Sequence, residues 1–111
     1  GIAVLQKSKE YCEKMKFEFN RRRIFLLNLL NEMDIDPGYN PTGAFYVMYK
    51  YKNYKKSSFE FCLEVLEKTG VATAPGRDFG PGGEGYIRLS YAQSIENIER
   101  ALKKLLESKL L

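Results

Sequence analysis

The chain has 111 residues, a net charge of +4 and an apolar fraction of 44%, with eight Tyr and seven Phe. This composition is typical of one folded domain and excludes a disordered chain. The mild positive charge permits an anionic partner but does not require one. No apolar run approaches the roughly 20 residues of a membrane-spanning helix, and no signal peptide is visible at the start.

The two cysteines, Cys12 and Cys62, fall in segments that we expect to be helical. Their spacing is not that of metal ligands, and the chain has no histidine, which argues against a zinc site. We therefore expect two buried, reduced thiols rather than a disulfide, as in a cytoplasmic protein.

Residues 3–33 contain no Pro or Gly and predict one long helix. A helix of about 30 residues would be about 45 Å long, so part of it should project or pack on something outside this chain. A coiled coil is an alternative, but Ser8 and Arg22 or Arg23 interrupt the stripe that it would need. The expected apolar stripe consists of Leu5, Cys12, Met15, Phe19, Leu26, Leu30 and Met33.

The middle of the chain predicts a loop over residues 34–43, a strand over 44–51 and then a helix. Bulky side chains on both faces of the strand favour a central position in a sheet. Ser57 and Glu60 have the spacing of a capping box at the start of the helix, and Gly70 should end it. The side chains expected to be buried on this helix are Phe59, Cys62, Leu63 and Leu66.

Residues 71–92 predict a short strand over 71–74, a rigid loop rich in Gly and Pro, and a second strand over 86–92. In the second strand Ile87, Leu89 and Tyr91 alternate with Tyr86, Arg88, Ser90 and Ala92, so the two sets point to opposite faces. Arg88 is unusual because a charge in the middle of a strand is costly unless it is paired.

Ser94 should cap a last helix, whose buried stripe would be Ile95, Ile98, Leu102, Leu105 and Leu106. The expected fold is therefore α+β, with a small three-stranded sheet packed against helices. A helical crossover is consistent with parallel pairing of the first two strands, and the short glycine-rich loop favours an antiparallel return.

Four blocks of the sequence resemble the C-terminal small domain of fold-type I pyridoxal-phosphate aminotransferases, in the aspartate aminotransferase-like class I/II branch. The blocks are Asn20-Arg21-Arg22-Arg23, Gly43-Ala44-Phe45-Tyr46, the segment from Val71 to Ala92, and the helix from Ser94 to Leu106. They follow one another in the family's order and cover most of the chain.

The resemblance implies that Arg88 binds the α-carboxylate of the substrate. It implies that residues 1–33 form the helix leading from a large domain and that residues 34–111 form the small domain, so that a chain starting with Gly is a piece of a larger protein. No catalytic or cofactor-binding residue is expected here, because in this family the lysine, aspartate and phosphate-binding residues for pyridoxal 5'-phosphate lie in the large domain. The isolated piece should be inactive.

The parent protein is expected to be a cytoplasmic homodimer that acts on amino acids and 2-oxo acids. A lyase or synthase of the same superfamily is an alternative, because it would keep the same arginine.

Three other interpretations stay open. Arg88 could form a structural ion pair with a carboxylate such as Glu84. The run of residues 21–23 could bind phosphate, although a solvated helix face with one arginine near an acidic neighbour is the simpler expectation. A basic module binding nucleic acid could use interleaved aromatic and cationic side chains, although we prefer a core strand that continues into a solvated loop. The side chains concerned are Tyr46, Tyr49, Tyr51, Tyr54, Lys50, Lys52, Lys55 and Lys56.

Overall fold

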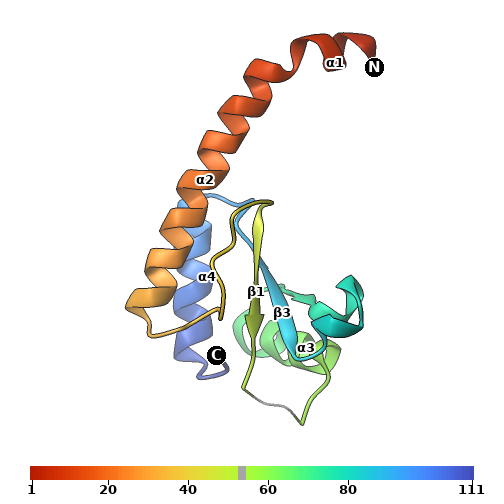
Figure 1. The fold of residues 1–111 in the computed structure, drawn as a ribbon. Helices are drawn as coiled ribbons and strands as arrows, with labels where there is room; N and C mark the ends of the chain where they lie inside the picture. The colour runs from red at the N-terminus through yellow and green to blue at the C-terminus, as the bar shows by residue number, and fades with distance from the viewer. Residues whose placement is uncertain (53–54) are drawn as a thin grey trace.

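The computed structural model describes residues 1–52 and 55–111, which form helices around a small three-stranded sheet, as expected (Figure 1). The helices are α1 (Ile2–Lys7), α2 (Lys9–Glu32), α3 (Ser58–Thr69) and α4 (Ile95–Glu107). The strands are β1 (Tyr46–Lys50), β2 (Ala74–Pro75) and β3 (Tyr86–Ser90), with short 3-10 turns at Gly76–Phe79 and Pro81–Gly83. No helix of the described ranges has the length and apolar character needed to cross a membrane.

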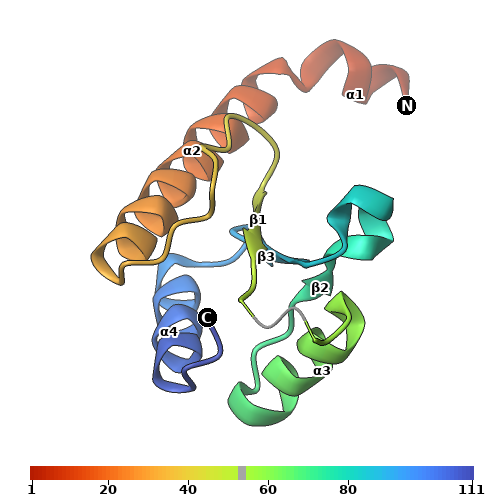
Figure 2. The same cartoon turned by 60° about the horizontal axis from the view of Figure 1, so that its bottom comes forward.

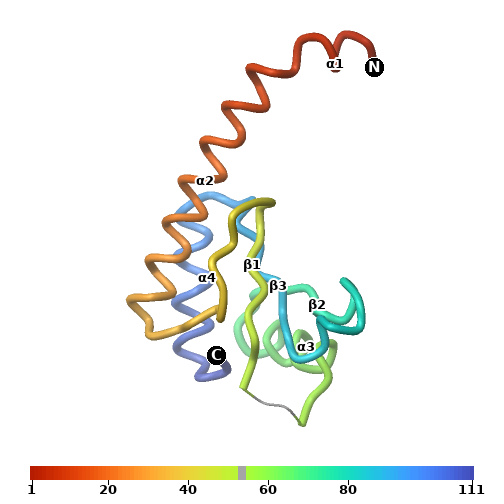
Figure 3. Tube along the Cα trace, in the orientation of Figure 1, coloured from red at the N-terminus to blue at the C-terminus, as the bar shows by residue number. Residues whose placement is uncertain are grey.

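The long N-terminal segment is two helices rather than one, because Ser8 separates α1 from α2. Ser8 keeps a nearly helical backbone, and its carbonyl accepts a hydrogen bond from the Cys12 amide at 2.8 Å, so the interruption is local. Figure 3 shows α1 and the first turns of α2 projecting away from the sheet. Within α2 the buried residues are Leu26 and Leu30, both in its second half.

The strand order is β1-β3-β2, so β3 is central and β1 lies at an edge, contrary to the expectation for residues 44–51. A side chain meets the outer edge of β1 instead of a strand: the Met48 amide donates to the Tyr39 hydroxyl at 2.8 Å. Both outer strands run antiparallel to β3, as predicted for the glycine-rich return. The first two strands are therefore parallel in direction but do not pair with each other.

The core lies between one face of the sheet and helices α2, α3 and α4, which are arranged around it in Figure 2. The predicted alternation in β3 is confirmed, because Ile87, Leu89 and Tyr91 are all buried. Helix α4 contributes Ile98, Leu102 and Leu105, whereas Leu106, which was also expected in the core, is exposed. The helices leave the other face of the sheet, with Tyr46, Met48 and Arg88, outside this core.

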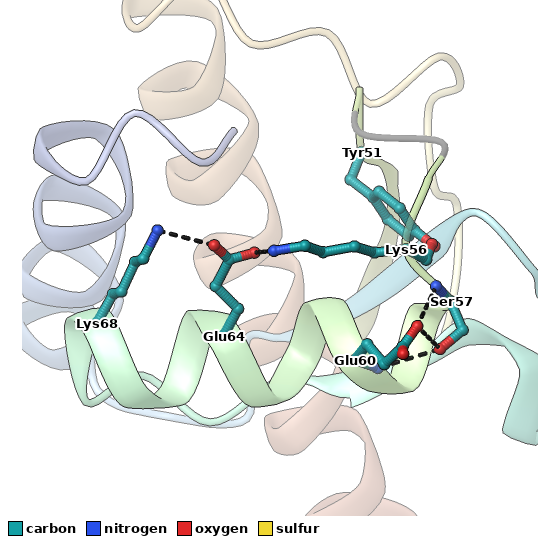
Figure 4. A network of polar contacts seen from close by, with 6 residues as sticks. All are labelled: Tyr51, Lys56, Ser57, Glu60, Glu64 and Lys68. Carbon is teal, nitrogen blue, oxygen red and sulfur yellow. Dashed lines mark hydrogen bonds and ion pairs between the residues drawn. The ribbon is translucent and has the colours of Figure 1, made fainter.

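Helix α3 begins and ends as predicted but buries a different face. Ser57 and Glu60 form the capping box, in which the Ser57 amide donates to the Glu60 carboxylate at 2.9 Å (Figure 4). Gly70 ends the helix in the left-handed conformation. The core-facing side chains are Phe61, Cys62, Val65 and Thr69, while Phe59, Leu63 and Leu66 are exposed. The expectation for these last three is wrong because α3 has apolar side chains on two faces, and the position of the sheet selects one of them.

Polar contacts along α3 join it to the segment that follows β1. The Glu64 carboxylate lies between the amino groups of Lys56 and Lys68, at 2.6 and 2.7 Å, and both hydrogen bonds lower its pKa (Figure 4). The Tyr51 hydroxyl donates to the Lys56 carbonyl at 2.7 Å, and its ring stacks on Phe61 with centroids 4.3 Å apart. These contacts hold the end of β1 against the N-terminal half of α3.

Candidate functional site

Arg88 lies at the middle of the central strand, on the face of the sheet opposite the core. Its neighbours in register are Met48 on β1 and Ala74 on β2, and neither carries a charge. Residues opposite each other in an antiparallel pair share a face, so Met48 and Ala74 flank the arginine directly.

Two aromatic rings contact the guanidinium group of Arg88. Its Cζ atom lies 4.7 Å from the centroid of Phe79 and 5.3 Å from that of Tyr46. The two rings are themselves stacked, with centroids 6.3 Å apart and planes 26° apart. These distances are within the range of cation–π attraction. The arginine therefore lies over two neighbouring aromatic faces.

Arg88 makes no hydrogen bond or ion pair with the described residues, and its Nε atom is buried without a partner. A buried polar atom without a partner is uncommon in folded proteins and calls for an explanation. The alternative of a structural pair with Glu84 is not observed. The Glu84 carboxylate instead accepts a hydrogen bond from the Ser58 amide at 2.6 Å, which lowers its pKa, and lies 3.5 Å from the Tyr51 hydroxyl oxygen.

Phe79 reaches the arginine because two glycines close the loop that carries it. Gly76 and Gly83 approach so closely that a Cβ atom on either would overlap the backbone of the other. Gly76 follows β2 directly, and Gly83 comes three residues before β3, so their contact closes the connection between the strands. The tight loop predicted from the Gly and Pro content is confirmed, and it places an aromatic ring beside Arg88.

The three consecutive arginines lie on α2 and make local contacts. Arg21 and Arg22 both donate to the Glu18 carboxylate, at 2.9 and 2.7 Å, and these hydrogen bonds lower the Glu18 pKa to about 2. Arg23 instead donates to the carbonyl of Pro41 at 2.9 Å, which ties the loop before β1 to the helix. The expectation of a solvated face with one arginine near an acid was therefore too simple, because two arginines share that acid.

Burial removes most of the aromatic surface on which the nucleic-acid interpretation relied. Tyr49 and Tyr51 are buried in the core, and Tyr46 lies against Arg88. Lys56 is paired with Glu64. Tyr54 lies outside the described residues. Bases stack only on accessible rings, and of the two tyrosines in β1, Tyr49 is buried and Tyr46 is half-buried.

The cysteines differ from each other, although both are free. Cys62 is buried as predicted, and burial raises the pKa of its thiol. Cys12 is exposed, which corrects the expectation of two buried thiols. It lies near the start of α2, whereas the buried residues of this helix, Leu26 and Leu30, are in its second half.

Comparison with known proteins identifies the family of this chain. The family model described as aminotransferase class I and II matches residues 2–105. The chain belongs to the class I and II aminotransferase family. YugH of Bacillus subtilis is 44% identical over 105 residues, which is 95% of this chain and 27% of that protein. An aspartate aminotransferase of Pyrococcus abyssi is 39% identical over 100 residues, which is 90% of this chain and 25% of that protein.

The fold of this aminotransferase domain is also that of solved relatives. The crystal structure of an aromatic aminotransferase from Pyrococcus horikoshii superposes with a TM-score of 0.80 at 36% identity, covering 95% of this chain and 29% of the other. The chain thus spans about a quarter of the length of the curated relatives that it matches. Relatives named for aspartate and for aromatic substrates share this domain, so membership of the family does not define the substrate side chain.

Sequence reasoning identified Arg88 but did not assign Tyr46 or Phe79 to its site. In the sequence, Tyr46 belongs to a possible stacking surface and to the block Gly43-Ala44-Phe45-Tyr46, and Phe79 lies within the segment from Val71 to Ala92. The missing information was the β1–β3 register, which pairs Met48 with Arg88 and brings Tyr46 within reach. Only when this register is known do the aromatic residues at the start of β1 and in the glycine-rich loop indicate a contact with Arg88.

Proposed function

We propose that this chain is the C-terminal small domain of an aminotransferase that transfers an amino group between an amino acid and a 2-oxo acid. Residues 1–33 would lead from a large domain that lies outside the chain, and residues 34–111 would form the small domain. Arg88 would bind the α-carboxylate of the substrate. The proposal also includes a homodimeric parent and, in keeping with two free thiols, a cytoplasmic location.

The unpaired state of Arg88 carries this proposal. A structural arginine on a strand would be expected to contact a carboxylate of the same domain, yet Glu84 is occupied by Ser58. A guanidinium group stays charged at any working pH and offers a planar set of donors that matches two carboxylate oxygens. Every amino acid and 2-oxo acid has such a carboxylate, so this contact would bind and orient the substrate without selecting its side chain.

The residues of this chain do not fit a pyridoxal phosphate site. A lysine that forms a Schiff base with this cofactor is activated by a desolvated or cationic pocket. Every lysine of the chain lies in the described residues, and none of them is buried. We therefore infer that the parent holds the cofactor, which serves as the electron sink of the reaction, in its large domain.

A lyase or synthase of the same superfamily is the alternative reaction, and it would also use Arg88. Product analysis of the full-length protein distinguishes the two. An aminotransferase consumes an amino acid and a 2-oxo acid and forms one of each in equal amounts. A lyase or synthase would convert its amino acid without an amino acceptor, and that result would overturn the proposed reaction.

The substitution Arg88→Lys in the full-length protein tests the role of the arginine. Lysine keeps the charge but loses the two-point geometry, and hydrogen bonds to charged groups are worth about 1.5–3 kcal/mol each. We expect kcat/KM to fall on the order of a hundredfold, since about 1.4 kcal/mol corresponds to tenfold, with little change in Tm. Preserved activity with a collapsed Tm would identify Arg88 as a structural residue and refute the assignment.

A further inference from the structure

We propose that Tyr46 and Phe79 are positioning residues, which hold the guanidinium plane of Arg88 in the orientation that binds the substrate carboxylate. The inference rests on the proposed function of Arg88 and adds two residues to it. Neither ring needs to touch the substrate for this role. Their faces would fix the plane of the arginine, and its terminal nitrogens would supply the donors.

Among the contacts of Arg88, only those with the two aromatic rings can fix the orientation of its guanidinium group. Met48 and Ala74, its neighbours in register, have no charged group or hydrogen-bonding side chain to orient it. Its Nε atom is buried without a partner, so no hydrogen bond fixes the side chain from that end. An arginine has several rotatable bonds, and ordering them only when a ligand arrives would weaken binding. Ring faces at 4.7 and 5.3 Å from Cζ restrict those rotations before the substrate binds.

The two rings also come from separate parts of the fold, each held by its own contacts. Tyr46 begins β1 and makes an edge contact with Phe45, which in turn lies 6.2 Å from Phe19 on α2, measured between ring centroids. Phe79 belongs to the loop closed by Gly76 and Gly83. The long helix and the glycine loop therefore meet at Arg88 through aromatic contacts. A shift of either element would turn the guanidinium plane.

The inference is tested with Phe79→Leu and Tyr46→Leu in the full-length protein, which keep an apolar side chain but remove the ring face. Two further variants, Phe79→Trp and Tyr46→Phe, keep an aromatic ring at each position. Phe59→Leu is the matched control. The Phe59 side chain is 55% exposed, close to the 51% of Phe79, and it makes no ring or cation contact among the described residues.

We expect each leucine variant to raise KM for the amino acid about tenfold, the scale of a partly desolvated cation–π contact, with a smaller change in kcat. The KM of each aromatic variant should stay within about twofold of the value of the unsubstituted enzyme, and the control variant should have an unchanged KM. Each variant is also followed by thermal unfolding. If the rings only stabilise the loop, the leucine variants should have a lower Tm, but KM should not rise more than kcat changes.

The outcomes separate the inference from the proposed function. If Arg88→Lys impairs the enzyme but both leucine variants keep the KM of the unsubstituted enzyme, the positioning role is refuted and the carboxylate assignment stands. If Arg88→Lys itself leaves KM and kcat unchanged, the carboxylate assignment fails and the positioning role fails with it. If the aromatic variants raise KM as much as the leucine variants do, KM does not depend on the ring faces, and the proposal is wrong.

Discussion

Gly76 and Gly83 lie backbone against backbone, seven positions apart, at the two ends of the loop that carries Phe79. A Cβ atom on Gly76 would overlap the carbonyl oxygen of Gly83, and one on Gly83 would overlap the carbonyl oxygen of Gly76. Backbone atoms cannot move aside as the end of a flexible side chain can. The contact therefore limits both positions to glycine and sets the path of the loop.

Replacing either glycine by alanine should consequently destabilise the domain. For Gly83→Ala we expect a loss of about 3 kcal/mol in the free energy of unfolding, the upper part of the range for overpacking. Gly82→Ala is the matched control, because a Cβ atom there meets nothing within 4 Å. Urea unfolding of the three proteins gives the comparison. Equal stability of Gly83→Ala and Gly82→Ala would mean that the loop does not make this close contact in solution.

The Glu84 carboxylate should make stability depend on pH. Its pKa is lowered mainly by the hydrogen bond from the Ser58 amide, so the charged form is favoured in the folded state. The stabilisation is complete above the ordinary carboxyl pKa of 4.5 and is lost as the pH falls through the lowered value. Glu84→Gln should therefore lower the urea midpoint at pH 7. The difference in midpoint between this variant and the unsubstituted protein should shrink below pH 4.5. A difference that stays constant down to the acid limit would contradict this.

The first half of the long helical segment should exchange its amide hydrogens faster than the second half. No residue of α1 is buried, whereas Leu26 and Leu30 in the second half of α2 pack into the core. Hydrogen exchange of the 111-residue chain, followed by mass spectrometry, compares residues 3–16 with residues 24–30. Strong, equal protection of both would indicate self-association through the projecting half or a different packing of the helix.

The isolated chain should not bind pyridoxal phosphate at a specific lysine, because no lysine of this chain occupies a buried pocket. Titration with the cofactor, recorded by absorbance and followed by borohydride reduction and peptide mapping, measures this. We expect weak, non-saturating modification spread over several exposed lysines. A stoichiometric, saturable Schiff base on one lysine would overturn the assignment of the chain to a domain without the cofactor site.

Local features were predictable from the sequence because they depend on nearby residues. The capping box of Ser57 and Glu60 and the helix end at Gly70 need only a few neighbouring positions, and both are observed. The assignment of side chains to the two faces of β3 follows from the two-residue period of an extended chain, and this period does not depend on the rest of the fold. The motif around Arg88 was readable for the same reason, since it occupies one continuous segment.

Tertiary structure alone decided which surfaces meet. Helix α3 has apolar side chains on two faces, so only the position of the sheet determined that Phe61 and Val65 are buried while Leu63 is exposed. The edge position of β1 depends on its pairing with β3, some 40 residues later in the chain. That same register places Tyr46 against Arg88, and the contact between Gly76 and Gly83 brings Phe79 there. Contacts between distant segments depend on the packing of the whole chain, and no periodicity within one segment encodes them.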